Sequence, residues 1–247
     1  FESFDEKPIA AASIGQVYAA RLHDGRDIVL KLRRPGIRKQ MEADLRILAH
    51  IAELAEQNLP DVRRYRPREI VRLLSNALLE ELDFTVEARN TETLADAFAQ
   101  DPNIVVPAIH WPFTSERLLV QDRLSGVPVS DAAALCASGL DRALIARRGA
   151  EAFLKAAFDE GLFHADPHSG NLFCLAGNRV GFIDFGMIGR LSSTRRSEVV
   201  QFIGAVIAGD GRGVRNVMVK WGGTPEDGLD ALTADADAFA LRNSTHP

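Results

Sequence analysis

The chain has 247 residues, 46% of them hydrophobic and 26% charged, with a formal net charge of −5 at pH 7. This is the composition of a globular protein long enough to bury a core, and it excludes a largely disordered chain. The acidic balance argues against a general nucleic-acid-binding surface, because such surfaces are basic.

The spacing of the cysteines and the length of the apolar runs indicate the cellular compartment of the chain. Cys136 and Cys174 have no Cys-x-x-Cys spacing, so neither a disulfide framework nor a zinc site is expected, and a reducing compartment fits. No run approaches the ~18 to 20 consecutive apolar residues that span a bilayer. We expect a soluble, cytoplasmic chain as given, and a fragment, since it begins without Met.

The first half of the chain predicts a hairpin followed by helices. Residues 14–20 and 28–33 are apolar strand candidates joined by His23-Asp24-Gly25. Apolar residues then recur at helical spacing over 38–57 and over 68–99, with the second helix ending near Asp101-Pro102.

The second half predicts further strands and then helices. Asp141 is a candidate N-cap for a helix through residue 158, with an end signal at Gly161. Strands are expected at 105–109, 117–121, 172–174 and 180–183, and helices at 194–208 and 213–219. This order predicts a two-lobed α+β protein, with an N-lobe over 1–123 and a truncated C-lobe over 124–247.

Two segments suggest phosphoryl transfer. Residues 163–171 read Phe-His-Ala-Asp-Pro-His-Ser-Gly-Asn, and residues 180–186 read Val-Gly-Phe-Ile-Asp-Phe-Gly. In this arrangement Asp166 orients or deprotonates an acceptor hydroxyl, while Asn171 and Asp184 supply hard oxygen ligands for Mg²⁺. Gly186 is expected to allow a sharp turn. The alternative is that the three polar residues only cap turns and a helix.

His164 and His168 stand four residues apart, as in some zinc sites. Pro167 lies between them and prevents an ordinary helix that carries both on one face. Hydrogen bonds that stabilise the loop are the preferred role of His164, and His168 either does likewise or approaches the phosphates.

Lys31 lies inside the apolar run Ile-Val-Leu-Lys-Leu, where an ammonium needs a partner or a phosphate unless it faces solvent on an edge strand. Residues 80–87 offer several carboxylates as that partner. On one continuous helix Glu80, Asp83 and Glu87 share a face and Glu81 lies about 100° away. Periodicity does not choose among them.

An alanine-rich stretch precedes the first strand, where a kinase has its glycine-rich phosphate loop. Side chains at these positions keep the backbone from approaching phosphates as glycines would, so altered nucleotide binding is expected unless the stretch is only packing. The candidate loop residues are Ala10, Ala11, Ala12 and Ser13.

With these motifs the chain resembles the UbiB family of atypical, protein-kinase-like proteins associated with ubiquinone (coenzyme Q) biosynthesis. The resemblance covers nearly the whole chain. It rests on residues 8–17, Val29-Leu-Lys31, Arg34-Pro-Gly-Ile37, Glu81-Leu-Asp83-Phe, Glu87-Ala-Arg-Asn90, residues 163–171 and Asp184-Phe-Gly186. Ser169 departs from the proline usual there, which puts the rigidity of that loop in doubt.

The resemblance implies a role for each candidate. Lys31 is the nucleotide-phosphate lysine and Glu87 its ion-pair partner, while Glu81 and Asp83 form the family's acidic pair. Asp166 is the catalytic-loop aspartate, and Asn171 and Asp184 are the magnesium ligands.

The resemblance also implies ATP and Mg²⁺ as cofactors. It predicts an atypical kinase or ATPase, with quinone-biosynthesis enzymes or a lipid-like molecule as partners and no nucleic acid. The family's upstream Lys-x-Gly-Gln extension and its membrane-associated C-terminal segment are not in this sequence, so membrane attachment, peripheral or at the inner membrane, would come from segments outside it. The alternatives are a nucleotide-sensing module without turnover and a small-molecule phosphotransferase.

Overall fold

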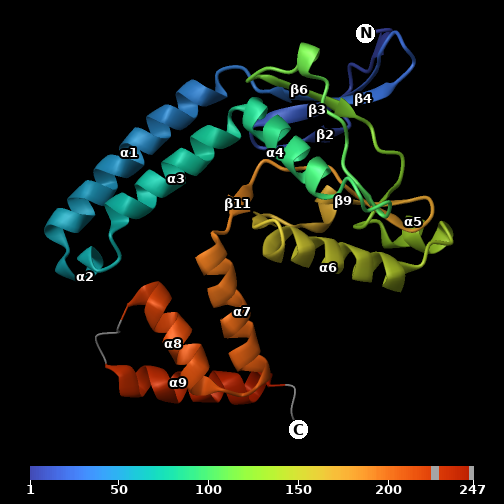
Figure 1. The fold of residues 1–247 in the computed structure, drawn as a ribbon. Helices are drawn as coiled ribbons and strands as arrows, with labels where there is room; N and C mark the ends of the chain where they lie inside the picture. Colours follow the sequence, from blue (N-terminus) through green and yellow to red (C-terminus); the bar gives the residue numbers. More distant parts are fainter. Residues whose placement is uncertain (224–227, 245–247) are drawn as a thin grey trace. The chain divides into compact units, whose positions relative to one another are not determined.

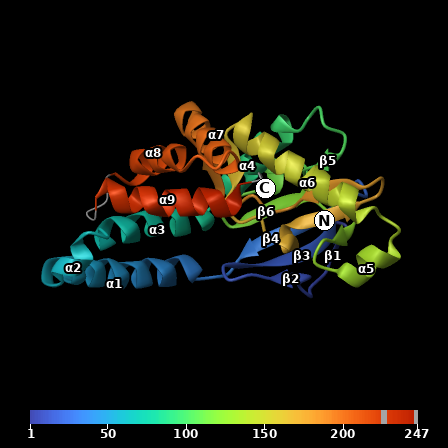
Figure 2. The same cartoon turned by 90° about the horizontal axis from the view of Figure 1, so that it is seen from below.

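The computed structural model describes residues 1–223 and 228–244, which form two compact units (Figures 1 and 2). Unit 1 comprises Phe1–Phe153 and His164–Ile188, and unit 2 comprises Leu154–Phe163 and the chain from Gly189 onward. The lobe boundary after residue 123 stays a prediction.

The first sheet of unit 1 carries Lys31 at its centre. Its strands are β1 (Ser3–Phe4), β2 (Ala10–Ala11), β3 (Gly15–Arg21), β4 (Asp27–Arg33) and β6 (Leu118–Asp122), in the order β1-β3-β4-β6 with β2 also on β3. The predicted β3–β4 hairpin is confirmed. Lys31 pairs with Val17 on one side and with Leu119 on the other, so β4 is an interior strand.

The two faces of this sheet have different neighbours. Leu119 is fully buried and packs with Ile14, Leu82, Phe84 and Ala88. On the opposite face, Val120 packs with a second cluster. Because directly paired residues share a face, Lys31 and Leu119 both face the helix that carries Phe84 and Ala88. The members of the second cluster are Ala20, Leu22, Ile28, Leu30 and Val120.

Four helices follow the hairpin: α1 (Ile37–Asn58), α2 (Pro60–Arg63), α3 (Pro67–Glu81) and α4 (Phe84–Ala97). α1 and α3 lie side by side (Figure 1).

The prediction of one helix over residues 68–99 is wrong, because the chain breaks at Leu82 and Asp83. Asp83 is extended (φ −108°, ψ 96°) and its Oδ1 accepts a hydrogen bond from the Thr85 amide at 2.9 Å, which starts α4. Arg33 donates to the Leu82 carbonyl at the end of α3.

The second sheet of unit 1 has the order β5-β10-β9-β7. The expected antiparallel pair β9 (Leu172–Leu175) and β10 (Arg179–Phe182) is confirmed. β5 is only Ile104–Val105, shorter than the predicted 105–109, since Pro107 has no amide to donate to a neighbouring strand. β7 is Val127–Pro128.

The remaining elements surround these strands. The expected helix after Asp141 is α6 (Arg142–Phe158), and the Leu144 amide donates to Asp141 Oδ1 at 3.0 Å. α5 is Ala132–Ala137, β8 Leu162–His164 and β11 Ile188–Arg190, with 3₁₀ turns at Trp111–Phe113 and Ser169–Asn171.

Unit 2 contains α7 (Ser193–Ile207), α8 (Gly211–Gly222) and α9 (Leu229–Asn243). The first two were expected. α9 was not, because its buried residues are the small Ala236 and Ala240, which pack with Val214. None of the helices over residues 1–223 and 228–244 has both the length and the apolar character needed to cross a membrane.

Candidate active site

Lys31 lies at the centre of a buried charge cluster. Its side chain is 13% exposed, and its Nζ donates to Glu87 on α4 and to Asp184 Oδ2 at 3.1 Å. Burial acts to lower the pKa of Lys31, but the two carboxylates outweigh it and raise that pKa above its ordinary value. The edge-strand alternative is excluded, because β4 pairs with β3 and β6 and the Lys31 side chain is buried.

Glu87 and Asp184 respond differently to the same lysine. Burial holds the pKa of Glu87 above its usual range despite the nearby ammonium. Burial acts in the same direction on Asp184, but Lys31 and the Gly186 amide together bring the pKa of that carboxyl below its ordinary value. Asp184 therefore stays ionised at neutral pH.

The segment around Asp184 is held by hydrogen bonds from several elements. The Gly186 amide donates to Asp184 Oδ1 at 3.1 Å, and His164 Nε2 lies 2.7 Å from the Asp184 carbonyl oxygen. Asn90 Nδ2 donates to the carbonyl of Phe185, whose side chain is 2% exposed. The chain bends at Gly186, as expected, but Gly186 is outside the left-handed region, so the bend does not require a glycine there and the Asp184 side chain helps to hold it.

The loop that carries Asp166 and Asn171 is tied to this segment. Asn171 Nδ2 donates to the Asp166 carbonyl at 3.4 Å, and the Ile183 amide donates to the Asn171 carbonyl at 3.1 Å. Asn171 is buried, whereas half of the Asp166 side chain is exposed. The Asp166 carboxylate is thus accessible from solvent.

His164 and His168 stabilise this loop, as expected. The Asp166 amide donates to His164 Nδ1 at 3.2 Å, and the Gly170 amide donates to His168 Nδ1 at 3.0 Å. No cluster of three His, Cys, Asp or Glu side chains that could hold a metal is found among the described residues.

The structure separates the two expected acidic residues. Glu81 ends α3, and its pKa is raised by burial and by the negative charges of Asp184 and Asp166. Glu81 is therefore close enough to the two candidate motifs for their carboxylates to act on its pKa. Asp83 instead accepts from the amide and hydroxyl of Thr85, as a helix cap.

The alanine-rich stretch forms a short exposed strand and turn. Ala10 and Ala11 pair with Val17 and Gln16 on β3, and the Ala12 amide donates to the Gly15 carbonyl at 2.9 Å. Ser13 is exposed at the turn. The Ala12 amide is therefore engaged within the turn, and a role of this stretch toward phosphates stays a prediction.

Two positioning residues were not identified from the sequence. Asn90 holds the Phe185 carbonyl, and Gln121 Nε2 on β6, the last strand of the first sheet, donates to the Ile183 carbonyl at 3.2 Å. Gln121 is 3% exposed, and its Oε1 has no partner among the described residues. A polar residue directly after Leu118-Leu-Val120 was the available signal.

Comparison with known proteins gives one family. The ABC1 atypical kinase-like domain family matches residues 1–218. The chain belongs to this family. Proteins named "Probable protein kinase UbiB" are 36% identical to it in Xylella fastidiosa (strain M12) and 38% identical in Pectobacterium carotovorum subsp. carotovorum (strain PC1). Each alignment covers 100% of this chain, which spans 46% and 45% of those relatives.

A solved structure supports the same conclusion. The Mycobacterium tuberculosis protein Rv3197, solved with erythromycin, is 28% identical and superposes with a TM-score of 0.70 over 89% of this chain and 55% of its own. This superposition confirms the α+β, kinase-like fold. The matches to proteins named UbiB, which cover the whole chain, confirm the UbiB resemblance.

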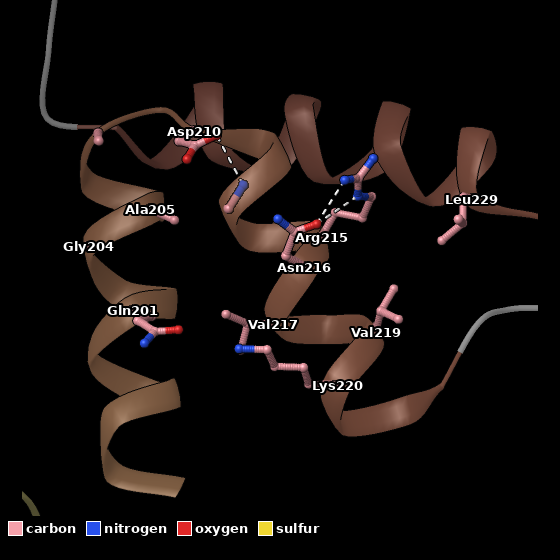
Figure 3. A pocket seen from close by; sticks show the side chains of 12 residues that line it. Gln201, Gly204, Ala205, Asp210, Arg215, Asn216, Val217, Val219, Lys220 and Leu229 are labelled. Carbon is pink, nitrogen blue, oxygen red and sulfur yellow. Dashed lines mark hydrogen bonds between the residues drawn. The ribbon is translucent and has the colours of Figure 1, made fainter. Parts of the chain in front are cut away.

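Unit 2 holds a hollow of about 770 Å³ between α7 and α8, bordered by Leu229 of α9 (Figure 3). Several of its polar side chains are already paired. Arg215 donates to Asn216 Oδ1 at 2.8 Å, and Asp210 Oδ1 accepts from the Gly213 amide at 3.0 Å. This hollow is therefore a weaker candidate for the functional site than the Lys31 cluster.

Proposed function

We propose that this domain binds Mg-ATP and acts as an atypical kinase or ATPase that supports ubiquinone biosynthesis. The observation that carries the proposal is that the buried Lys31 ammonium contacts both the buried Glu87 carboxylate and the partly exposed Asp184 carboxylate. An ammonium has three donors, so after these two contacts one donor is left for a nucleotide phosphate.

The side chains near Asp184 suit a hard cation. Asp184 supplies a carboxylate and Asn171 an amide oxygen, and Mg²⁺ in phosphoryl-transfer sites is commonly held by one or two such ligands with the substrate phosphates. Burial and the negative charges of Asp184 and Asp166 together raise the pKa of Glu81. When bound, the cation would neutralise charge on the transferring phosphoryl group.

The protein's own groups would orient the reactants. Lys31, fixed by Glu87, would hold nucleotide phosphates, and the exposed carboxylate of Asp166 would accept a proton from an acceptor hydroxyl or a water. His164 forms hydrogen bonds with both the Asp166 amide and the Asp184 carbonyl. It therefore holds the two backbone segments that carry these carboxylates in a fixed arrangement.

The alanine-rich stretch bears on the two alternative functions, a sensing module and a small-molecule phosphotransferase. Its alanine side chains and the paired Ala12 amide favour a changed nucleotide preference, as in a sensing module without turnover. A small-molecule phosphotransferase shares the Asp-to-Asn spacing but would not need Glu81. Quinone-biosynthesis enzymes or a lipid-like molecule are the proposed partners.

Phosphate release from Mg-ATP by the intact protein tests the proposal. Lys31→Ala and Asp184→Asn should each lower turnover at least about 100-fold, since both remove charge from the phosphoryl-transfer site. Asp27→Asn is the control, because Asp27 forms an exposed ion pair with Arg21. Tight nucleotide binding with no turnover in the unmodified protein would reject the enzyme and favour the sensing module.

A further inference from the structure

α6 covers an apolar hollow of about 390 Å³ in unit 1, separate from the Lys31 cluster. It is lined by residues of β9 and β10 in the second sheet, by residues of α5, and by the first two turns and middle of α6. The lining side chains that matter most here are Leu135, Ile145, Leu172, Cys174 and Val180. We call this hollow the α6 groove.

A second hollow of about 240 Å³ extends the α6 groove. It shares Gly149 and Leu172 with the first, so the two adjoin. Its far end is formed by Phe153, Pro167 and His168. An occupant of both would therefore lie along α6 and reach the loop that carries Asp166.

The sequence of α6 leaves this space open. Arg142, Ala146, Gly149 and Phe153 recur every three or four residues, so they share one face of the helix, and two of them are small. A Cβ placed on Gly149 would meet no atom within 4 Å. Glycine inside a helix costs about 0.5–1 kcal/mol relative to alanine, and neither backbone conformation nor close packing requires it here.

One positive charge stands at the end of the α6 groove that is farther from the Asp166 loop. Arg142 is exposed and has no hydrogen-bond or ion-pair partner among the described residues. The neighbouring carboxylates of Asp131 and Asp141 accept from the Ala134 and Leu144 amides as helix caps. Arg142 is the only charged side chain lining the larger hollow.

We propose that the α6 groove binds a linear hydrocarbon chain that ends in a carboxylate, with the carboxylate on Arg142 and the chain passing Gly149 toward Pro167. A guanidinium pairs with a carboxylate through two parallel hydrogen bonds. A size of about 300–1,000 Å³ and a mostly apolar lining with few polar groups are typical of small-molecule sites. A peptide fits worse, because its backbone amides and carbonyls would find almost no partners in this lining.

Calorimetric titration of the intact protein with dodecanoate, below its micellar concentration, tests this proposal without relying on nucleotide use. One dodecanoate should bind per chain, and dodecyltrimethylammonium, which has the same chain and the opposite charge, should bind at least about ten-fold more weakly. Gly149→Leu should weaken dodecanoate binding at least about ten-fold, because the new side chain fills the space shared by both hollows.

Matched variants distinguish an effect on the α6 groove itself from a general effect on the fold. Arg142→Gln should weaken dodecanoate binding roughly three- to ten-fold, whereas Arg147→Gln, on another face of α6, should leave it unchanged. Gly204→Leu, at another open helical glycine, controls for the leucine. Should Gly149→Leu fail to fold, Ala146→Phe fills the same groove. Absence of binding, equal affinity for both amphiphiles, or unchanged affinity after filling the groove would each overturn the proposal.

Discussion

The contact between Lys31 and Glu87 shows what a single buried charge requires. Both side chains are nearly inaccessible to solvent, so removing one partner leaves the other buried without a partner. The sequence indicated that Lys31 needs a carboxylate but offered several. Glu87 is the partner because the break at Asp83 sets the start, and hence the phase, of α4.

Removing either partner of this pair should destabilise the protein. Lys31→Met and Glu87→Gln should each lower the free energy of unfolding by about 3 kcal/mol, and the double variant should lose less than the sum. Urea denaturation measures this. Arg21→Met, which breaks the exposed pair with Asp27, should change little. Strictly additive losses would mean that the two buried charges do not interact.

The two cysteines should differ in reactivity. Cys174 is 1% exposed and burial raises the pKa of its thiol, so the reactive thiolate is rare at neutral pH, whereas Cys136 is exposed. Iodoacetamide at pH 8 should modify Cys136 first, as followed by mass spectrometry. Cys174 should react only as the pH rises or the fold opens, and equal rates in the native protein would contradict its burial.

Among the elements, strands and isolated helices were predictable and the junction between α3 and α4 was not. Apolar spacing at residues 38–57 predicted α1 to within a residue at each end. The same spacing over residues 68–99 did not reveal the break at Asp83, because the helical pattern of apolar residues continues through Leu82. At the break, the Thr85 amide donates to the Asp83 side chain instead of to a helical carbonyl. Capping competes with helix locally, and tertiary contacts decide the outcome.

The cap at Asp83 gives a prediction at this scale. Asp83→Ala should lower the free energy of unfolding by about 1 kcal/mol, because the Thr85 amide loses its acceptor. Asp83→Ser should restore most of the stability, since serine also caps helices. If Asp83→Ser keeps stability but loses nucleotide binding, the carboxylate has a role beyond the cap. If both variants bind nucleotide normally, Asp83 is structural.

At the scale of the whole molecule, the two units have separate cores. Val214, fully buried in unit 2, packs with Ala236 and Ala240, whereas unit 1 is organised around its sheets. α6 contributes residues to both units, since the division falls between Phe153 and Leu154. Independent cores predict separate opening of the two units.

Val214→Ala should reveal this separation. The cavity should destabilise unit 2 by about 2 kcal/mol, so amides of α8 and α9 should exchange hydrogen faster while those of β3 and β4 keep their protection. Hydrogen-exchange mass spectrometry measures both. Val200→Ala, at an exposed valine of α7, is the matched control. Equal acceleration in β3 and β4 would show one cooperative unit.

The sequence by itself determined the fold class, the hairpin that carries Lys31, and the motifs around Asp166, Asn171 and Asp184, because local spacing and turn chemistry encode these. The family resemblance implied the pair of Lys31 with Glu87, which periodicity left open, and the tertiary structure shows this contact. Only the tertiary structure decided that burial and the charge of Asp184 raise the pKa of Glu81 while Asp83 caps a helix, and that Asn90 and Gln121 hold the Asp184 segment. These contacts join residues far apart in the chain, and their burial and charge depend on packing that no local pattern contains.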